Sequence, residues 1–457
     1  MPPPGHNASG HHTTLPVLSG KLQCVANRSS ETIGTPRSKS RNRLIIWSFH
    51  PASIYVPPSN RLSSGPFRCI PMVRAVAENQ PGRNQNRMCS DNSIGAFIAR
   101  LKGVMAVHPV AGIDSDSHFN TLAMELFSLQ SEHNPIYRLL CERSGKTTRT
   151  VSHWSEIPTV PTSAFKEWDI TSIPTGERSR WFCSSGTTDQ RPSRHLHSTA
   201  SLSIYEHSLW PPFQQHLLPE GCAFGQGLSW ISLTPPSHLA PHSSLIHMFS
   251  TIRARVEPAS FHWCSRVGPS GDWELHPQEV LSALNEACAK QTPVVLLGTA
   301  FLFLNLLDAM DAPVTRLHLP PGSRILETGG YKGRTRSVPK AELHSLLCSR
   351  LGLPQSNIIT EYGMAELSSQ AYDRICGHKA GTPLHFPPWA RARIISPETG
   401  VEAMDGKAGL LQIFDLANVH SVLAIQTEDL AVRRGDGFEL IGRQPRAEAR
   451  GCSLMAP

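Results

Sequence analysis

The chain has 457 residues, 39% hydrophobic and 17% charged, which is enough for one large or two to three smaller globular domains. Its net charge of +7 is concentrated at the start, because residues 1–87 hold eleven Lys and Arg against two Glu, a balance of +9, leaving −2 for residues 88–457. A near-neutral body excludes a nucleic-acid-binding protein, which needs a basic stripe on its folded part.

Residues 1–87 are rich in Ser, Pro, Asn and Arg and have no sustained period, so we expect disorder there. Two interpretations remain open: a segment with transit-peptide character, or a mis-called start with translation beginning at Met88. We expect the main domain to span residues 88–440 and a tail to span residues 441–457. The longest apolar stretch, residues 293–307, is too short to span a membrane. Eleven Cys with no CxxC pair favour reduced thiols in a cytoplasmic protein.

The body alternates helical and strand patterns along the chain. We expect helices within residues 93–145, 201–218 and 338–350. We expect strands at residues 181–183, 228–233, 294–297, 325–327 and 358–362, followed by shorter β segments at 392–395, 410–414, 422–426 and 439–441. This order predicts an α/β body followed by a smaller β-rich part.

A loop of small hydroxyl residues and glycine follows the strand at residues 181–183. It reads Ser184, Ser185, Gly186, Thr187 and Thr188. Glycine lets backbone N–H groups approach a polyphosphate and the hydroxyls add donors, so the loop is a candidate phosphate cradle. It lacks the GxxxxGK[ST] pattern of a Walker loop, and an ordinary Ser/Thr/Gly turn remains the alternative.

The strand at residues 358–362 ends in Tyr362-Gly363, with Glu366 three residues beyond the glycine. An aromatic ring there can stack on adenine, and one well-placed carboxylate is enough to hold Mg²⁺ beside phosphates. The alternative is a capped helix start with a solvated Glu366.

Two further polar positions follow apolar strands. Asp429 comes after residues 422–426 and can accept the hydroxyls of a ribose. Arg443 lies just past the last expected strand, where it can contact ribose or phosphate. For both residues a plain surface position is the alternative.

The order of these motifs resembles that of the adenylate-forming ligases, and within them the LuxE-type acyl-protein synthetases, the ATP-using part of a fatty acid reductase complex. The similarity runs over roughly residues 115–455 and is carried by the stretches 184–188, 297–301, 328–333, 361–370 and 450–454. It implies the α/β fold of the N-terminal domain of those ligases, with a truncated C-terminal tail. The implied activity is ATP-dependent conversion of a carboxylic acid, expected to be a long-chain fatty acid, to acyl-AMP.

The resemblance also implies roles for single residues. The loop 184–188 would cradle the β- and γ-phosphates of ATP, and Gly329 and Gly330 would pass close to adenine. Tyr362 would stack on the base, Gly363 would form the turn after it, and Glu366 would hold Mg²⁺. Asp429 would bind the ribose, and Arg443 would lie at the ribose or a phosphate.

In LuxE-type proteins the acyl group moves to a cysteine near the C-terminus, and Cys452 fits that place. A thiolate is a strong nucleophile toward a mixed anhydride, and the neighbouring Arg446 and Arg450 favour the thiolate form. From composition alone Cys452 is an idle tail thiol. An acyl-reductase partner protein is implied by the resemblance only.

Three departures keep other functions open. Ala365 stands where the family usually has Thr, Asp189 stands where it tends to have Gly, and the separate C-terminal domain of CoA ligases is not found before the chain ends at Pro457. The alternatives are an acyl-CoA ligase of the phenylacetate type and a catalytically degenerate nucleotide-binding module.

Overall fold

The structure is a computed structural model that describes residues 93–106, 115–184, 191–269, 271–310, 316–329, 338–378 and 383–443. All of these residues belong to one compact unit, which begins at Gln85. The expected leader at residues 1–87 and the candidate acceptor Cys452 lie outside the described residues.

The central element is a six-stranded sheet with the order β11-β10-β9-β8-β4-β5. Its strands are β4 (Ser229–Ser232), β5 (Ser260–Trp263), β8 (Val294–Thr299), β9 (Arg324–Thr328), β10 (Ile358–Tyr362) and β11 (Ala371–Tyr372). All neighbouring pairs are parallel except β10 and β11, which are antiparallel. Parallel sheets of this kind are buried on both faces. Because side chains of successive strand residues point to opposite faces, each strand contributes residues to a core on either side of the sheet.

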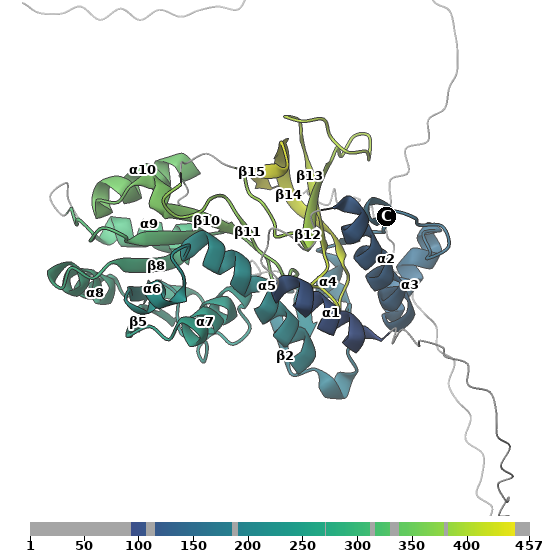
Figure 1. Cartoon of the computed structure of the whole chain (residues 1–457), viewed down its shortest axis with the longest axis horizontal. Coiled ribbons are helices and arrows are strands. Elements are labelled where there is room, and N and C mark those ends of the chain that lie inside the picture. The colour runs from purple at the N-terminus through teal and green to yellow at the C-terminus, as the bar shows by residue number, and fades with distance from the viewer. Residues whose placement is uncertain are drawn as a thin grey trace, which may run out of the picture. The chain divides into compact units, whose positions relative to one another are not determined.

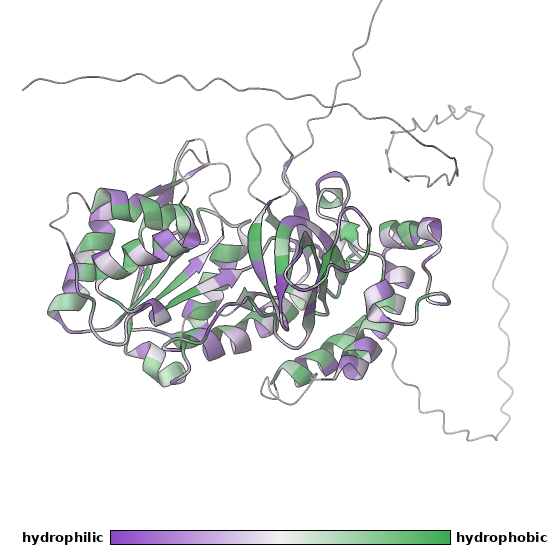
Figure 2. Cartoon of the chain, turned by 90° about the horizontal axis from the view of Figure 1, so that it is seen from above, coloured by the Kyte–Doolittle hydropathy of each residue, from purple (hydrophilic) through white to green (hydrophobic). Residues whose placement is uncertain are grey.

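Helices cover both faces of this sheet (Figure 1). One core is built from α8 (Pro277–Ala289), α9 (Ala300–Ala309) and α10 (Lys340–Leu351) against alternate strand residues such as Leu296 and Ile325. The other core contains α5 (Thr199–Leu217), α6 (Cys222–Gln226) and α7 (Ser244–Val256) against Leu297 and Leu326. Figure 2 shows hydrophobic residues along the strands between the helices, as burial on both faces of the sheet requires.

A second, mostly antiparallel sheet has the order β1-β14-β13-β12, with β15 paired to β14. Its strands are β1 (Val160–Pro161), β12 (Ala390–Ile395), β13 (Ala408–Asp415), β14 (Ala424–Arg434) and β15 (Gly437–Arg443). It packs against α1 (Ile94–Ala106), α2 (Asp116–His133) and α3 (Pro135–Ser144) in a third core.

The remaining elements are short. Two hairpins are formed by β2 (Arg180–Cys183) with β3 (Arg194–His197), and by β6 (Ser265–Val267) with β7 (Trp273–Leu275). The others are α4 (Ala164–Glu167) and the 3₁₀ turns η1 (Trp154–Glu156), η2 (Thr175–Glu177) and η3 (Gln355–Asn357).

The predicted helices and strands are found in the predicted order, α7, β5 and α8 were not predicted, and two corrections fall at functional positions. Asp429 lies inside β14, because that strand continues to Arg434, and Arg443 is the last residue of β15 rather than a residue beyond it. The apolar stretch at 293–307 contains β8 and most of α9, which meet without a gap because Thr299 both ends the strand and accepts a hydrogen bond from the N–H of Leu302. Within the described part of the chain, no helix is both long and apolar enough to cross a membrane.

Candidate active site

Two glycine turns lie side by side at the carboxyl edge of the central sheet. β9 ends at Thr328 and is followed by Gly329 in the left-handed region, with φ +67°. β10 ends at Tyr362 and is followed by Gly363. The two strands are parallel neighbours with Thr328 opposite Glu361, so the turns emerge at the same edge, where open α/β sheets bind ligands. Gly330 lies outside the described residues.

The predicted phosphate loop is the connection of the β2–β3 hairpin. Its first residue, Ser184, accepts a hydrogen bond from the backbone N–H of Ser193 at 3.2 Å, which closes the base of the loop. The side chain of Ser193 in turn donates a hydrogen bond to Oε1 of Glu366. The hairpin is therefore joined to the predicted magnesium ligand, while Ser185, Gly186, Thr187 and Thr188 are outside the described residues.

Glu366 is held in place through its backbone as well as its side chain. It is 3% exposed, and Asn418 donates a hydrogen bond to its carbonyl oxygen at 3.0 Å. The preceding carbonyl, that of Ala365, accepts a hydrogen bond from Nδ1 of His195 at 3.0 Å. Burial raises the pKa of Glu366, and the Ser193 hydroxyl offsets part of this shift. The alternative of a solvated Glu366 at a helix start is wrong, since residues 363–370 form no helix.

The predicted adenine and ribose residues form a connected group. The hydroxyl of Tyr362 donates to Oδ2 of Asp429 at 2.8 Å, and Nε of Arg443 donates to Oδ1 of the same carboxylate at 2.8 Å. Asp429 and Arg443 are paired across β14 and β15. Tyr362 and Asp429 are buried, whereas the side chain of Arg443 is 69% exposed.

This arrangement leaves part of the Asp429 carboxylate available to a ligand. Each of its carboxylate oxygens already accepts one hydrogen bond, but a carboxylate has about four acceptor positions, so ribose hydroxyls can still be accommodated. The ring of Tyr362 packs edge-to-face against Phe386 and Phe438, with centroids 6.2 and 5.7 Å away. Tyr362 is thus fixed both by its hydroxyl and by its ring.

Sequence reasoning missed two residues of this region, Ser193 and Glu361. Ser193 lies in a Pro- and Ser-containing loop with no motif to mark it. Glu361 is a charged residue in an otherwise apolar strand, which was a readable signal. It is buried, and its Oε2 accepts a hydrogen bond from the Thr328 hydroxyl. Burial raises the pKa of Glu361 to about 7; the Thr328 hydrogen bond lowers it and the neighbouring Glu327 raises it further.

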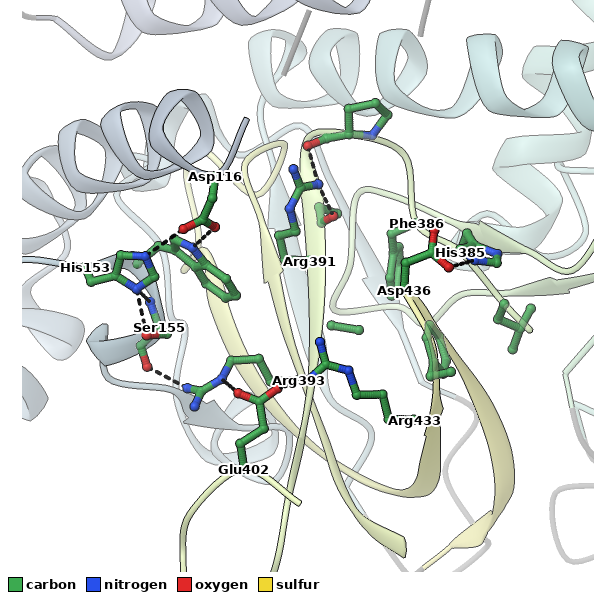
Figure 3. A pocket seen from close by; sticks show the side chains of 16 residues that line it. Asp116, His153, Ser155, His385, Phe386, Arg391, Arg393, Glu402, Arg433 and Asp436 are labelled. Atoms are coloured by element: carbon green, nitrogen blue, oxygen red, sulfur yellow. Dashed lines mark hydrogen bonds and ion pairs between the residues drawn. The ribbon is translucent and has the colours of Figure 1, made fainter. Parts of the chain in front are cut away.

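A separate cavity of about 650 Å³ opens beside the second sheet (Figure 3). Glu402 lies in it between two guanidinium groups, 3.1 Å from Nε of Arg393 and 2.7 Å from Nη1 of Arg433. None of the predicted site residues lines this cavity. Its walls include Phe386 and Phe438, the two rings that pack against Tyr362, so it lies behind the tyrosine. Most of its charged groups are paired with one another, Arg391 donates hydrogen bonds to the carbonyl oxygens of Pro388 and Ala390, and we assign no ligand to the cavity.

Comparison with known proteins gives a family and a fold. A family model described as acyl-protein synthetase, LuxE, matches residues 112–456. A long-chain-fatty-acid–luciferin-component ligase of Vibrio harveyi is 23% identical over 330 residues, which cover 70% of this chain and 82% of the relative. A protein of the same name from Aliivibrio fischeri is 22% identical over 364 residues, with coverages of 73% and 86%.

Among solved structures, 2-hydroxyisobutyryl-CoA ligase in complex with 2-HIB-AMP and CoA aligns with a TM-score of 0.50 at 14% identity, over 74% of this chain and 69% of that one. ATP-bound MatB from Rhodopseudomonas palustris has a TM-score of 0.40 at 18% identity and covers 60% of this chain; the chain spans about half of that protein's length, 49%. The predicted fold class is confirmed. Since the family model spans well over half of the sequence, the chain belongs to the LuxE family of acyl-protein synthetases and is a ligase, as its motif order predicted.

Proposed function

We propose that this chain activates a long-chain fatty acid with ATP, forming an acyl-adenylate, and then transfers the acyl group to a protein cysteine. The family match and the names of the two relatives support the reaction class and the acid. The observation that carries the proposal is the convergence, at one sheet edge, of the hairpin loop, Glu366 and the Tyr362–Asp429–Arg443 group.

In this proposal ATP lies along the carboxyl edge of the central sheet. Its β- and γ-phosphates contact the loop at residues 184–188, and its base lies between Gly329-Gly330 and Tyr362. Asp429 and Arg443 hold the ribose, where the strand pairing keeps the carboxylate and guanidinium in register. Because these groups are already held in place, they would accelerate the reaction by positioning the reactants and by stabilising charge in the transition state.

Glu366 fits a magnesium ion as its one protein carboxylate. Its side chain is buried with a raised pKa, so a nearby cation would compensate a carboxylate that burial leaves poorly stabilised. Among the described residues no cluster of three or more His, Cys, Asp or Glu is arranged around a metal. That finding is compatible with magnesium, which binds through one or two carboxylates together with substrate phosphates. When bound, the ion would neutralise charge on the departing pyrophosphate.

The chemistry has two steps. A carboxylate oxygen of the fatty acid attacks the α-phosphorus of ATP, the bond from that phosphorus to the bridging oxygen breaks, and pyrophosphate leaves. A thiolate then attacks the acyl carbon of the mixed anhydride, the bond to the AMP oxygen breaks, and a thioester forms. The proton lost from the thiol passes to solvent. We propose Cys452 as the thiol, and an acyl-reductase protein as the partner that consumes the thioester.

The test is ATP–pyrophosphate exchange by the full chain with Mg²⁺ and a series of fatty and aryl acids. We expect exchange that depends on a long-chain acid and is reduced at least a hundredfold in Glu366→Gln. Labelled fatty acid should then become covalently attached to the wild-type protein and to the matched control Cys288→Ser. It should not become attached to Cys452→Ser. Acid-dependent exchange with release of AMP only when CoA is added would instead identify an acyl-CoA ligase. A folded protein that binds ATP without exchange for any acid would refute the enzymatic proposal.

A further inference from the structure

Glu361 occupies the junction between the two glycine turns. It is the next-to-last residue of β10, 4% exposed, with Thr328 opposite it on β9 and Tyr372 opposite it on β11. Thr328 immediately precedes Gly329, and Tyr362 separates Glu361 from Gly363. A side chain at this position can therefore act on both turns at once.

The carboxyl group contacts each turn through a different oxygen. Oε2 accepts a hydrogen bond from the hydroxyl of Thr328, which joins the two strands through their side chains. Oε1 lies only 2.5 Å from the place where a β-carbon on Gly363 would stand. The second turn thus lies against the carboxyl group, and a larger residue than glycine at position 363 would displace the Glu361 side chain.

The surroundings of Glu361 favour a neutral carboxyl group. On its own face of the sheet, the titratable groups near it are Tyr205 from α5 and Tyr372 from β11, and neither tyrosine supplies a positive charge. Glu327 lies on the opposite face, where it contacts Thr360 and His344. Burial, offset in part by Thr328 and reinforced by Glu327, raises the pKa of Glu361 to about 7. Ionisation would bury a negative charge beneath the turns.

We propose that Glu361, in its neutral form, is a positioning residue that holds the Gly329 and Gly363 turns in the arrangement that receives ATP. The inference rests on the proposed function for the identity of the ligand. The Thr328–Glu361 hydrogen bond and the position of the carboxyl group beside Gly363 are features of the chain itself and do not depend on that identity. Ionised Glu361 would keep the Thr328 hydrogen bond, but its buried charge would favour a local opening that hydrates it and would repel the phosphates, so only the fraction of protein with a neutral group binds ATP well.

The first experiment measures the dissociation constant of ATP for the full-length protein between pH 6 and pH 8, by calorimetry. With a pKa of about 7, the neutral fraction falls about tenfold over this range, so the constant should rise roughly tenfold in the wild type. Glu361→Gln keeps an acceptor for Thr328 and cannot ionise, so its affinity should stay within about twofold. Glu398→Gln removes an exposed carboxylate elsewhere and should follow the wild type. Equal pH dependence in the wild type and Glu361→Gln would overturn the proposal.

A conservative pair tests the hydrogen bond. Thr328→Val removes the hydroxyl and should weaken ATP binding at pH 6, whereas Thr328→Ser retains it and should bind like the wild type. Equal weakening by Val and Ser would show that the hydroxyl is not what matters, and the proposed linkage would fail.

A second measurement needs no nucleotide. Amide hydrogen exchange at pH 8 should be faster in the wild type than in Glu361→Gln for peptides covering residues 324–329 and 358–364, and unaltered in Glu398→Gln. Identical rates in the wild type and Glu361→Gln would overturn the positioning role. If the wild type bound no ATP at either pH, the proposed function would fail, and this exchange measurement would still decide the role of Glu361.

Discussion

The contact between Tyr362 and Asp429 should make a measurable contribution to the free energy of unfolding. The hydroxyl of Tyr362 donates to a buried carboxylate at 2.8 Å, a charge-assisted bond of the kind worth about 1.5–3 kcal/mol. Asp429→Ala removes this acceptor and leaves the buried tyrosine hydroxyl without its partner. We expect a loss of about 2–4 kcal/mol. The ion pair with the exposed Arg443 should account for at most about 1 kcal/mol of it.

A double-mutant cycle isolates this contact. Tyr362→Phe removes the hydroxyl and keeps the ring packing against Phe386 and Phe438, so it should cost about 1–2 kcal/mol in the wild type. It should cost almost nothing in Asp429→Ala, which gives a coupling energy of about 1–2 kcal/mol. Urea unfolding of the four proteins, followed by tryptophan fluorescence, measures the cycle. A coupling energy below about 0.5 kcal/mol would refute the reasoning, because additive effects mean no shared interaction.

Three further changes have definite expected outcomes. Burial lowers the pKa of His195 and of His420 to about 4, so the unfolded chain binds more protons as the pH falls. The contribution of the neutral histidines to the free energy of unfolding is therefore fully present above about pH 6.5 and is lost toward pH 4. At pH 5 the free energy of unfolding should be roughly 2 kcal/mol lower per histidine. Urea unfolding at pH 5 and pH 7.5 measures this difference, and equal stability at the two pH values would contradict the prediction. Gly409→Ala would bring a β-carbon within 2.6 Å of the carbonyl oxygen of Ile395, so it should lower the melting temperature by at least about 4 °C, and an unchanged value would mean that β12 and β13 separate easily. Leu306→Ala, at a fully buried site in α9, should cost about 2–5 kcal/mol in the same unfolding assay, and a loss below 1 kcal/mol would mean that the core relaxes around the cavity.

Helices and strands could be predicted where buried residues give the sequence a regular spacing of apolar side chains. The helical pattern containing Phe119, Leu126 and Phe127 is buried in α2 as expected, and the strand ending at Tyr362 has the predicted bounds. α7 and α8 were not predicted, although their buried residues do recur at helical spacing, as Val280, Ala283, Leu284 and Ala287 do in α8, so this signal was present in the sequence and was missed. The extent of β14 was misjudged because Thr427, Glu428 and Asp429 suggest a turn. They form an irregularity between the pairs Gln412–Gln426 and Leu410–Leu430, and the strand continues beyond them, paired to β13 and β15.

The candidate site was readable in its types of residue but not in its contacts. Motif order selected Tyr362, Glu366 and Asp429, which tertiary structure brings to one place. Nothing local in the sequence marks Ser193 as the partner of Glu366, because the two residues are far apart along the chain and their hydrogen bond exists only after the hairpin docks. Side-chain pairs of this kind depend on the packed fold, and propensity and periodicity carry no information about them.

The segment after β10 explains why residues of two different sheets can serve one ligand. Tyr362 is bonded to Asp429 on β14, and a few residues later the backbone N–H groups of Ser368 and Ser369 both donate to the buried carboxylate of Asp415 at 2.9 Å. Asp415 is the last residue of β13, so this one segment is anchored to both middle strands of the second sheet. Glu366 lies between the two anchors and is held by neither sheet alone. Binding of a nucleotide against Tyr362 and Glu366 would consequently depend on the packing of the second sheet as much as on the carboxyl edge of the first. A site built from these short motifs therefore requires both sheets to be in place.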